Sequence, residues 1–97
     1  MLTSAQIKIS LEPILKDFDI RYVALFGSVA RGENTPDSDV DLLVDIGHPM
    51  GMIQYMRFIN TIETALNSSI DVVPLKNIQP SLRREIQGNL QVIYEKR

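Results

Sequence analysis

The chain has 97 residues, of which 44% are hydrophobic and 23% are charged, so we expect one domain spanning residues 1–97. It has no cysteine, which excludes disulfides and thiolate metal sites, and its apolar runs are too short to cross a membrane. Its first residues do not fit a signal peptide and its net charge of -2 lacks the basic surplus of proteins that coat long nucleic acid, so we expect a cytoplasmic protein.

An N-terminal helix is the first predicted element. Thr3 and Gln6 fit a capping box, in which each side chain bonds the backbone N–H of the other residue. Apolar residues then recur at helical spacing as far as Phe18. Because Pro13 lies inside this pattern, we expect a kink or a break in the helix there.

Four strands are predicted further along the chain, over residues 21–26, 40–46, 70–75 and 90–95. Between them we expect a loop over 32–37, a helix over 51–67 and a short helix that begins at Pro80 and ends near Gly88. This order predicts an α/β (α+β) fold in which one sheet of about four strands is backed by helices. The link between the first two strands is too short to settle their relative direction.

The helix over 51–67 has an apolar stripe that should face the core. We predict that the stripe consists of Met52, Tyr55, Met56, Ile59, Ile62 and Leu66. Phe58 should lie at its edge. His48 falls in a Gly-His-Pro break before this helix, where we expect a solvated loop histidine.

Two acids, Asp39 and Asp41, interrupt the second predicted strand. Side chains alternate faces along a strand, so residues two apart point to the same side. Neighbouring carboxylates resist burial, so they are either solvated at a strand end or share cations, of which Mg²⁺ is the natural one. Asp71, the only acid inside the third predicted strand, can lie beside Asp41 if the two strands are neighbours. By itself, Asp71 equally fits a polar residue at a strand entrance.

A glycine follows the first predicted strand directly. Gly27 allows a sharp turn and the close approach of a ligand, and Ser28 opens a short helical turn that ends at Arg31. Free N–H groups and the Ser28 hydroxyl can hold phosphate oxygens, and Arg31 can add positive charge. Alone, these residues also fit an ordinary turn with a serine cap and a solvated arginine. The turn is not a P-loop, because no Gly-Lys-Ser/Thr ending follows.

The combination is more specific than its parts. Residues 27–32 (GSVARG) and 38–44 (SDVDLLV) resemble the signature of the DNA polymerase β-like nucleotidyltransferases, and especially its minimal nucleotidyltransferase (MNT) subgroup. The resemblance covers residues 22–94 and implies a mixed sheet flanked by helices. It also implies that two Mg²⁺ ions are held by the catalytic acids Asp39, Asp41 and Asp71. Gly27 and Ser28 match the triphosphate-binding turn, which Arg31 joins in our hypothesis.

Many MNT proteins resemble antitoxins that are paired with a HEPN-domain ribonuclease toxin. The resemblance therefore implies Mg²⁺-dependent transfer of AMP from ATP to a hydroxyl of a partner protein, a toxin tyrosine, which silences the toxin. Larger members of the superfamily add a helical domain for the acceptor. We expect no room for one in this chain, so the acceptor should come on another molecule.

Two alternatives stay open. The chain could be a catalytically silent antitoxin subunit that binds its partner and neutralises it by masking. It could also transfer nucleotides to a small molecule or to an RNA 3′ end, in which case it would turn over without the partner.

Overall fold

The computed structural model of the protein describes residues 2–35, 37–88 and 90–96. The predicted strands and helices are all present, and their ends differ from the predicted ones by a single residue in most cases. The expected loop over 32–37 includes Pro36, which lies outside the described residues. In chain order the elements are α1 (Ser4–Asp17), β1 (Tyr22–Phe26), α2 (Gly27–Arg31), β2 (Val40–Asp45), α3 (Met52–Leu66), β3 (Ile70–Pro74), the 3₁₀ helix η1 (Leu75–Asn77), α4 (Pro80–Gln87) and β4 (Gln91–Glu95).

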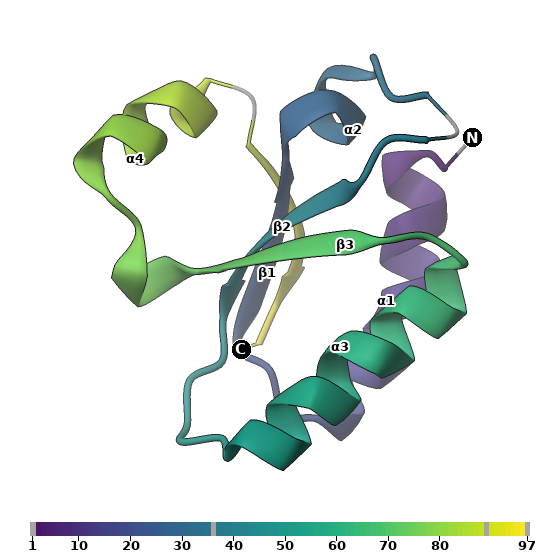
Figure 1. Ribbon diagram of the computed structural model, residues 1–97, viewed down its shortest axis with the longest axis vertical. Helices are drawn as coiled ribbons and strands as arrows, with labels where there is room; N and C mark the ends of the chain where they lie inside the picture. Colours follow the sequence, from purple (N-terminus) through teal and green to yellow (C-terminus); the bar gives the residue numbers. More distant parts are fainter. Residues whose placement is uncertain (1, 36, 89, 97) are drawn as a thin grey trace.

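The four strands form one mixed sheet in the order β3-β2-β1-β4. Strand β1 pairs antiparallel with both β2 and β4, which answers the question of direction that the short link left open. Strand β2 pairs parallel with β3, and α3 makes the crossover that a parallel pair requires. The predicted fold class, a sheet of about four strands flanked by helices, is therefore confirmed (Figure 1).

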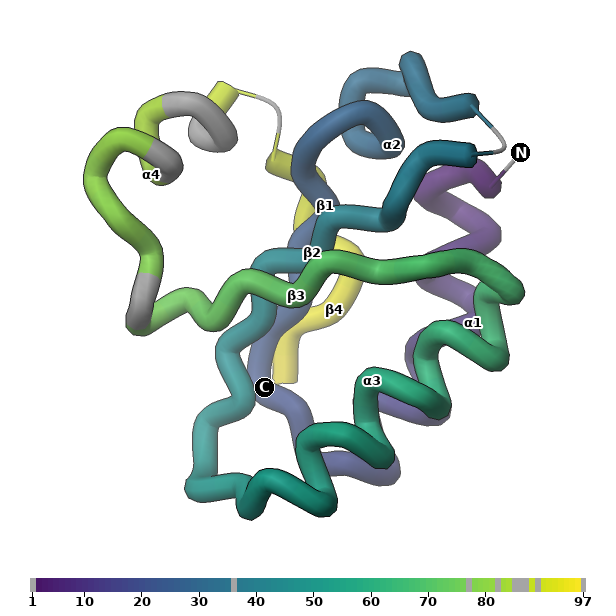
Figure 2. Tube along the Cα trace, viewed as in Figure 1, coloured from purple at the N-terminus to yellow at the C-terminus, as the bar shows by residue number. Residues whose placement is uncertain are grey.

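The two faces of the sheet are covered differently. Helices α1 and α3 lie side by side against one face, where they bury the main core (Figures 1 and 2). The opposite face carries a smaller apolar cluster around Ala24, Phe26 and Leu43, which η1 and the segments flanking α4 adjoin. We call this second face the open face. It is the face on which the acidic residues of β2 and β3 lie.

Helix α1 begins as predicted. The Thr3 side chain accepts a hydrogen bond from the Gln6 N–H (3.2 Å), and the Gln6 side chain accepts one from the Thr3 N–H (3.0 Å). Of the kink or break expected at Pro13, the break is wrong, because the helix continues to Asp17. Pro13 is exposed, away from the buried line of Ile7, Leu11 and Leu15, and the burial of that line stabilises the helix on both sides of the proline.

The predicted stripe of α3 was wrong in its phase. Phe58, expected at the edge, is fully buried, whereas Met52 is 78% exposed and Met56 is 49% exposed. A stripe through Met52 and Met56 and a stripe through Phe58 both fit helical spacing with Ile62. The second one is buried because Phe58 packs on Phe18, with ring centroids 5.2 Å apart. Within the described residues, none of the helices combines the length and apolar character needed to cross a membrane.

Candidate active site

An acidic pair lies on the open face, near the N-terminal ends of the parallel strands β2 and β3. In the parallel register of β2 and β3, Asp41 is directly opposite Asp71. Each is followed two residues later by an apolar residue of the open-face cluster, Leu43 or Val73, so both carboxylates are on that face. Asp41 is half-buried and Asp71 is exposed. The predicted neighbourhood of these two acids is therefore present.

The surroundings of Asp41 disfavour its negative charge. Burial raises the pKa of the Asp41 carboxyl, and the charges of Asp71 and Asp39 raise it further. The guanidinium of Arg31 acts in the opposite direction and lowers it. The site thus gathers carboxylates whose mutual repulsion a divalent cation would relieve, and the charge of Arg31 acts on one of them, Asp41.

Gly27 is the residue that lets Asp41 occupy its position. Its φ of +73° is in the left-handed region, and a Cβ added there would overlap Oδ2 of Asp41 and lie 3.1 Å from Cγ. The sequence predicted a close approach at Gly27. Within the protein itself, the group that approaches is the carboxylate of the neighbouring strand.

The turn after Gly27 has the predicted form. Helix α2 runs from Gly27 to Arg31 and ends at Gly32, whose φ of 72° is left-handed. Ser28 is half-buried in the first turn, two residues after the strand residue Phe26 that pairs with Asp41. The turn and the acidic pair therefore adjoin each other at one end of the sheet.

The shared direction of Asp39 and Asp41 stays a prediction. Strand β2 begins at Val40, so Asp39 precedes the strand and strand alternation does not fix its direction. It is exposed and lines a polar hollow of about 720 Å³ together with residues at the end of α3, among them Glu63 and Asn67. The strand register thus brings Asp41 and Asp71 together, and Asp39 adjoins this pair along the chain.

The donor set suits Mg²⁺ without forming a complete cage. Among the described residues, no three acidic, histidine or cysteine side chains are grouped closely enough to hold a metal by themselves. Mg²⁺ prefers hard oxygen ligands and is usually bound by one or two carboxylates together with substrate phosphates and water. Asp41 and Asp71 supply such carboxylates, and their position beside the α2 turn leaves the remaining ligands to a bound nucleotide.

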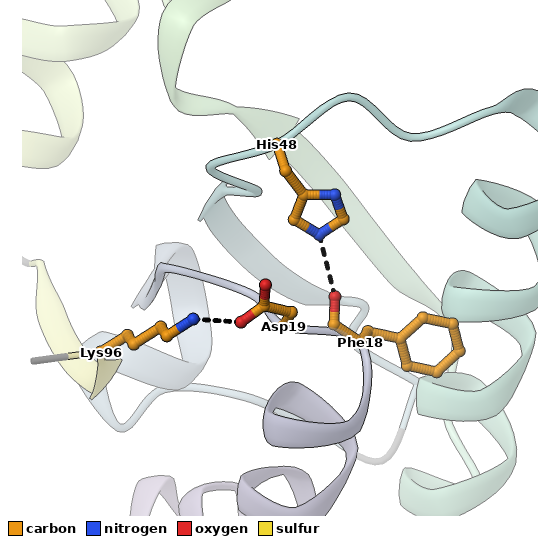
Figure 3. Close-up of polar contacts among 4 residues, drawn as sticks. All are labelled: Phe18, Asp19, His48 and Lys96. Atoms are coloured by element: carbon orange, nitrogen blue, oxygen red, sulfur yellow. Dashed lines mark hydrogen bonds and ion pairs between the residues drawn. The ribbon is translucent and has the colours of Figure 1, made fainter.

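His48 is structural and lies away from this site. It is half-buried, and its Nδ1 is 3.0 Å from the carbonyl oxygen of Pro49. Its Nε2 is 3.1 Å from the carbonyl oxygen of Phe18 (Figure 3). His48 is therefore a partly exposed loop histidine, as expected, whose ring also binds two backbone carbonyls. These hydrogen bonds raise the pKa of the His48 imidazole, next to the ion pair of Asp19 and Lys96. His48 follows the end of β2, whereas Asp41 is near its beginning.

The sequence reasoning missed Glu33. Its carboxylate accepts a hydrogen bond from Nε of Arg31 at 3.1 Å, and it is thereby part of the surroundings of the predicted nucleotide-binding turn. The signal was present in the sequence, because Arg31 and Glu33 have opposite charges and only a glycine separates them.

Comparison with known proteins places this site in a family. Residues 10–97 match the family model described as polymerase β, nucleotidyltransferase. The chain belongs to this nucleotidyltransferase family. A Methanocaldococcus jannaschii relative, named as a candidate protein adenylyltransferase, is 35% identical, with 93% of this chain and 97% of the relative covered. The protein adenylyltransferase MntA of Thermococcus cleftensis is 29% identical, with 97% of both chains covered.

Solved structures agree with the family assignment. A structure described as a candidate minimal nucleotidyltransferase is 28% identical and superposes with a TM-score of 0.74, over 92% of this chain and 94% of that one. A toxin–antitoxin crystal structure with AMP-PNP gives a TM-score of 0.76 over 93% of this chain and 74% of that chain. At 21% identity, this second likeness concerns the fold alone.

Proposed function

We propose that this chain, acting as one domain in the cytoplasm, transfers AMP from ATP to a hydroxyl of a partner protein. The observation that carries the proposal is the pairing of Asp41 with Asp71 beside the Gly27-Ser28 turn. Relatives of similar length that are named protein adenylyltransferases support it. Because one structural neighbour is a toxin–antitoxin complex, we propose that the partner is a HEPN-type ribonuclease toxin, modified on a tyrosine, and that the chain is its antitoxin.

The site residues divide into two groups with different tasks. Asp39, Asp41 and Asp71 would hold two Mg²⁺ ions, for which their oxygen donors are suited. When bound, Mg²⁺ neutralises triphosphate charge and lowers the pKa of the acceptor hydroxyl. Ser28 and the N–H groups of its turn would hold the β- and γ-phosphates, and Arg31 adds positive charge to them.

The transfer itself asks little further chemistry of the protein. The acceptor oxygen forms a bond to the α-phosphorus while the bond from that phosphorus to the bridging oxygen breaks, and pyrophosphate leaves. The hydroxyl proton passes to Asp71, which is exposed and can be reached by a side chain of another molecule. Positioning and charge neutralisation supply most of the rate enhancement.

Mass spectrometry of the partner tests this proposal. The chain is mixed with its HEPN-type partner, ATP and Mg²⁺, and we expect the partner to gain one AMP or more on tyrosine. The gain should vanish in Asp41→Asn. Asp45→Asn is the matched control. Asp45 is on the same strand and the same face of the sheet, but its Oδ2 is 3.9 Å from Nε of Arg21, with which it forms an ion pair. Equal modification by wild type and Asp41→Asn would contradict the assignment.

The same assay separates the alternatives. A partner that is inhibited but keeps its mass would indicate masking by a silent subunit. Release of pyrophosphate from ATP in the presence of small molecules or RNA, without the partner, would indicate the other class of acceptor.

A further inference from the structure

The contact between Arg31 and Glu33 has a structural origin in the end of α2. Gly32 adopts a left-handed conformation, and the chain folds back so that the Gly32 N–H donates to Val29 O (3.1 Å) and the Glu33 N–H to Ser28 O (2.9 Å). This closure is a Schellman-type helix end. It fixes the backbone of Glu33 against the same short helix that carries Ser28 and Arg31.

The geometry of the contact leaves one edge of the guanidinium available. Glu33 Oε2 binds Nε of Arg31 at 3.1 Å. A guanidinium has five N–H donors in a rigid plane, so an acceptor at Nε leaves the edge formed by the two terminal nitrogens directed elsewhere. That edge can bind two oxygens of one phosphate group.

Arg31 also has a competing partner. The Asp41 carboxylate lies against Gly27, the first residue of the short helix that ends at Arg31, so it is a candidate partner for the guanidinium. A flexible arginine would tend to pair with this carboxylate, which would occupy both a phosphate ligand and a metal ligand. Glu33 offers Arg31 a different anchor on its own helix end.

We propose that Glu33 is a positioning residue for Arg31: it holds the guanidinium with its terminal edge toward the nucleotide phosphates and away from Asp41. The inference rests on the proposed function only in assuming that the site binds a nucleoside triphosphate. Both side chains are partly exposed, at 42% for Arg31 and 67% for Glu33. The effect of the pair is therefore that of an exposed ion pair, about two- to fivefold in an equilibrium constant.

Calorimetric titration of the full chain with Mg²⁺ and AMP-PNP measures this effect without partner or turnover. We expect Glu33→Ala to raise the Kd about two- to fivefold. In an Arg31→Ala background the same change should not weaken binding any further, because Glu33 acts through Arg31. Glu12→Ala is the matched control: it also removes an exposed carboxylate, 3.3 Å from Lys16 on α1, and should leave the Kd unchanged.

The variant Glu33→Gln distinguishes an orienting effect of Glu33 on Arg31 from a direct effect of the Glu33 charge on the nucleotide. Removing a negative charge near a triphosphate would by itself tighten binding, whereas the glutamine oxygen can still accept from Nε. If Glu33 merely repelled the nucleotide, both Glu33→Gln and Glu33→Ala would bind more tightly than wild type, which would overturn the proposal. Weakening by Glu33→Ala that persists in the Arg31→Ala background would overturn it as well.

The outcomes also separate this inference from the proposed function. If wild type binds AMP-PNP with the expected Glu33 effect but modifies no partner, the transfer proposal fails and the positioning role stands. If wild type transfers AMP and Glu33→Ala binds as wild type does, only the positioning role fails. A wild-type chain that binds no nucleotide would refute both.

Discussion

The left-handed glycines at the two ends of α2 provide a matched pair of variants. Gly27 and Gly32 have φ values of +73° and +72°, so alanine at either position meets the same backbone strain, about 1–2 kcal/mol. A Cβ at Gly32 has no atom within 4 Å, whereas a Cβ at Gly27 overlaps the carboxylate of Asp41. Overpacking of this kind adds about 1–3 kcal/mol. We therefore expect Gly32→Ala to lower the free energy of unfolding by about 1–2 kcal/mol and Gly27→Ala by about 2–5 kcal/mol.

The two glycine variants should differ more in their rate of AMP transfer than in their free energy of unfolding. Displacement of a catalytic group by about 1 Å can cost on the order of a hundredfold in rate. We expect Gly27→Ala to lose about that factor in AMP transfer, and Gly32→Ala to lose much less. Denaturant unfolding gives the stabilities, and transfer is then measured at a temperature where both variants are folded. Equal losses of activity in the two folded variants would refute the inference that Gly27 makes room for Asp41.

Two further predictions concern the helical side of the sheet and the loop before α3. In urea titrations, Phe58→Ala should lower the free energy of unfolding by about 3–5 kcal/mol, because a fully buried ring is lost. Met52→Ala, at an exposed position, should change the free energy of unfolding by no more than about 0.5 kcal/mol. The raised pKa of His48 means that its bonds to Phe18 and Pro49 stabilise the fold below about pH 6.5 and cease to do so as the pH rises through the folded-state pKa. His48→Ala should therefore be less stable than wild type at pH 5.5 and approach it at pH 9, and a constant difference across that range would contradict this reading.

The acidic pair was predictable because it depends on two strong regularities. A period of two along a strand assigns Asp41 to the face opposite its apolar neighbours Val40 and Leu42. The helical segment between the second and third strands has the length of a parallel crossover, which makes them natural neighbours. Once the two strands are neighbours, Asp71 lies opposite Asp41, because each is the second residue of its own strand.

Features that depend on competition between similar arrangements were not predictable. Two stripes of α3 satisfied the same helical spacing, and the choice between them came from the contact of Phe58 with Phe18, residues 40 apart in the chain. Strand alternation could not give the direction of the Asp39 side chain, because β2 begins at Val40, as the predicted strand does, and Asp39 precedes it. Glu33 was missed although its charge and its spacing from Arg31 were visible in the sequence, because the contact depends on the left-handed closure at Gly32, which a glycine permits but does not require.

The position of the acidic pair should be costly for the fold when no cation is bound. The pKa of Asp41 is raised, so the stability linked to this group is present below about pH 4 and is lost as the pH rises through the folded-state value. At pH 7 with a chelator, Asp41→Asn should therefore be more stable than wild type, and Asp71→Asn should gain about 0.2–1 kcal/mol, the scale of one cross-strand charge pair. Because either change relieves the same repulsion, the double variant should gain less than the sum.

Adding Mg²⁺ and AMP-PNP should reverse this order, since ligands that bind only the folded state stabilise it and the two variants have lost metal-binding carboxylates. The pair of thermal unfolding series, with chelator and with ligand, thus tests whether these acids are held together for a cation. Variants that are less stable than wild type in the chelator would show that Asp41 and Asp71 support the fold by themselves. The repulsion that makes a cation necessary at this end of the sheet would then be absent, and with it the main physical reason for assigning the site to metal-assisted transfer.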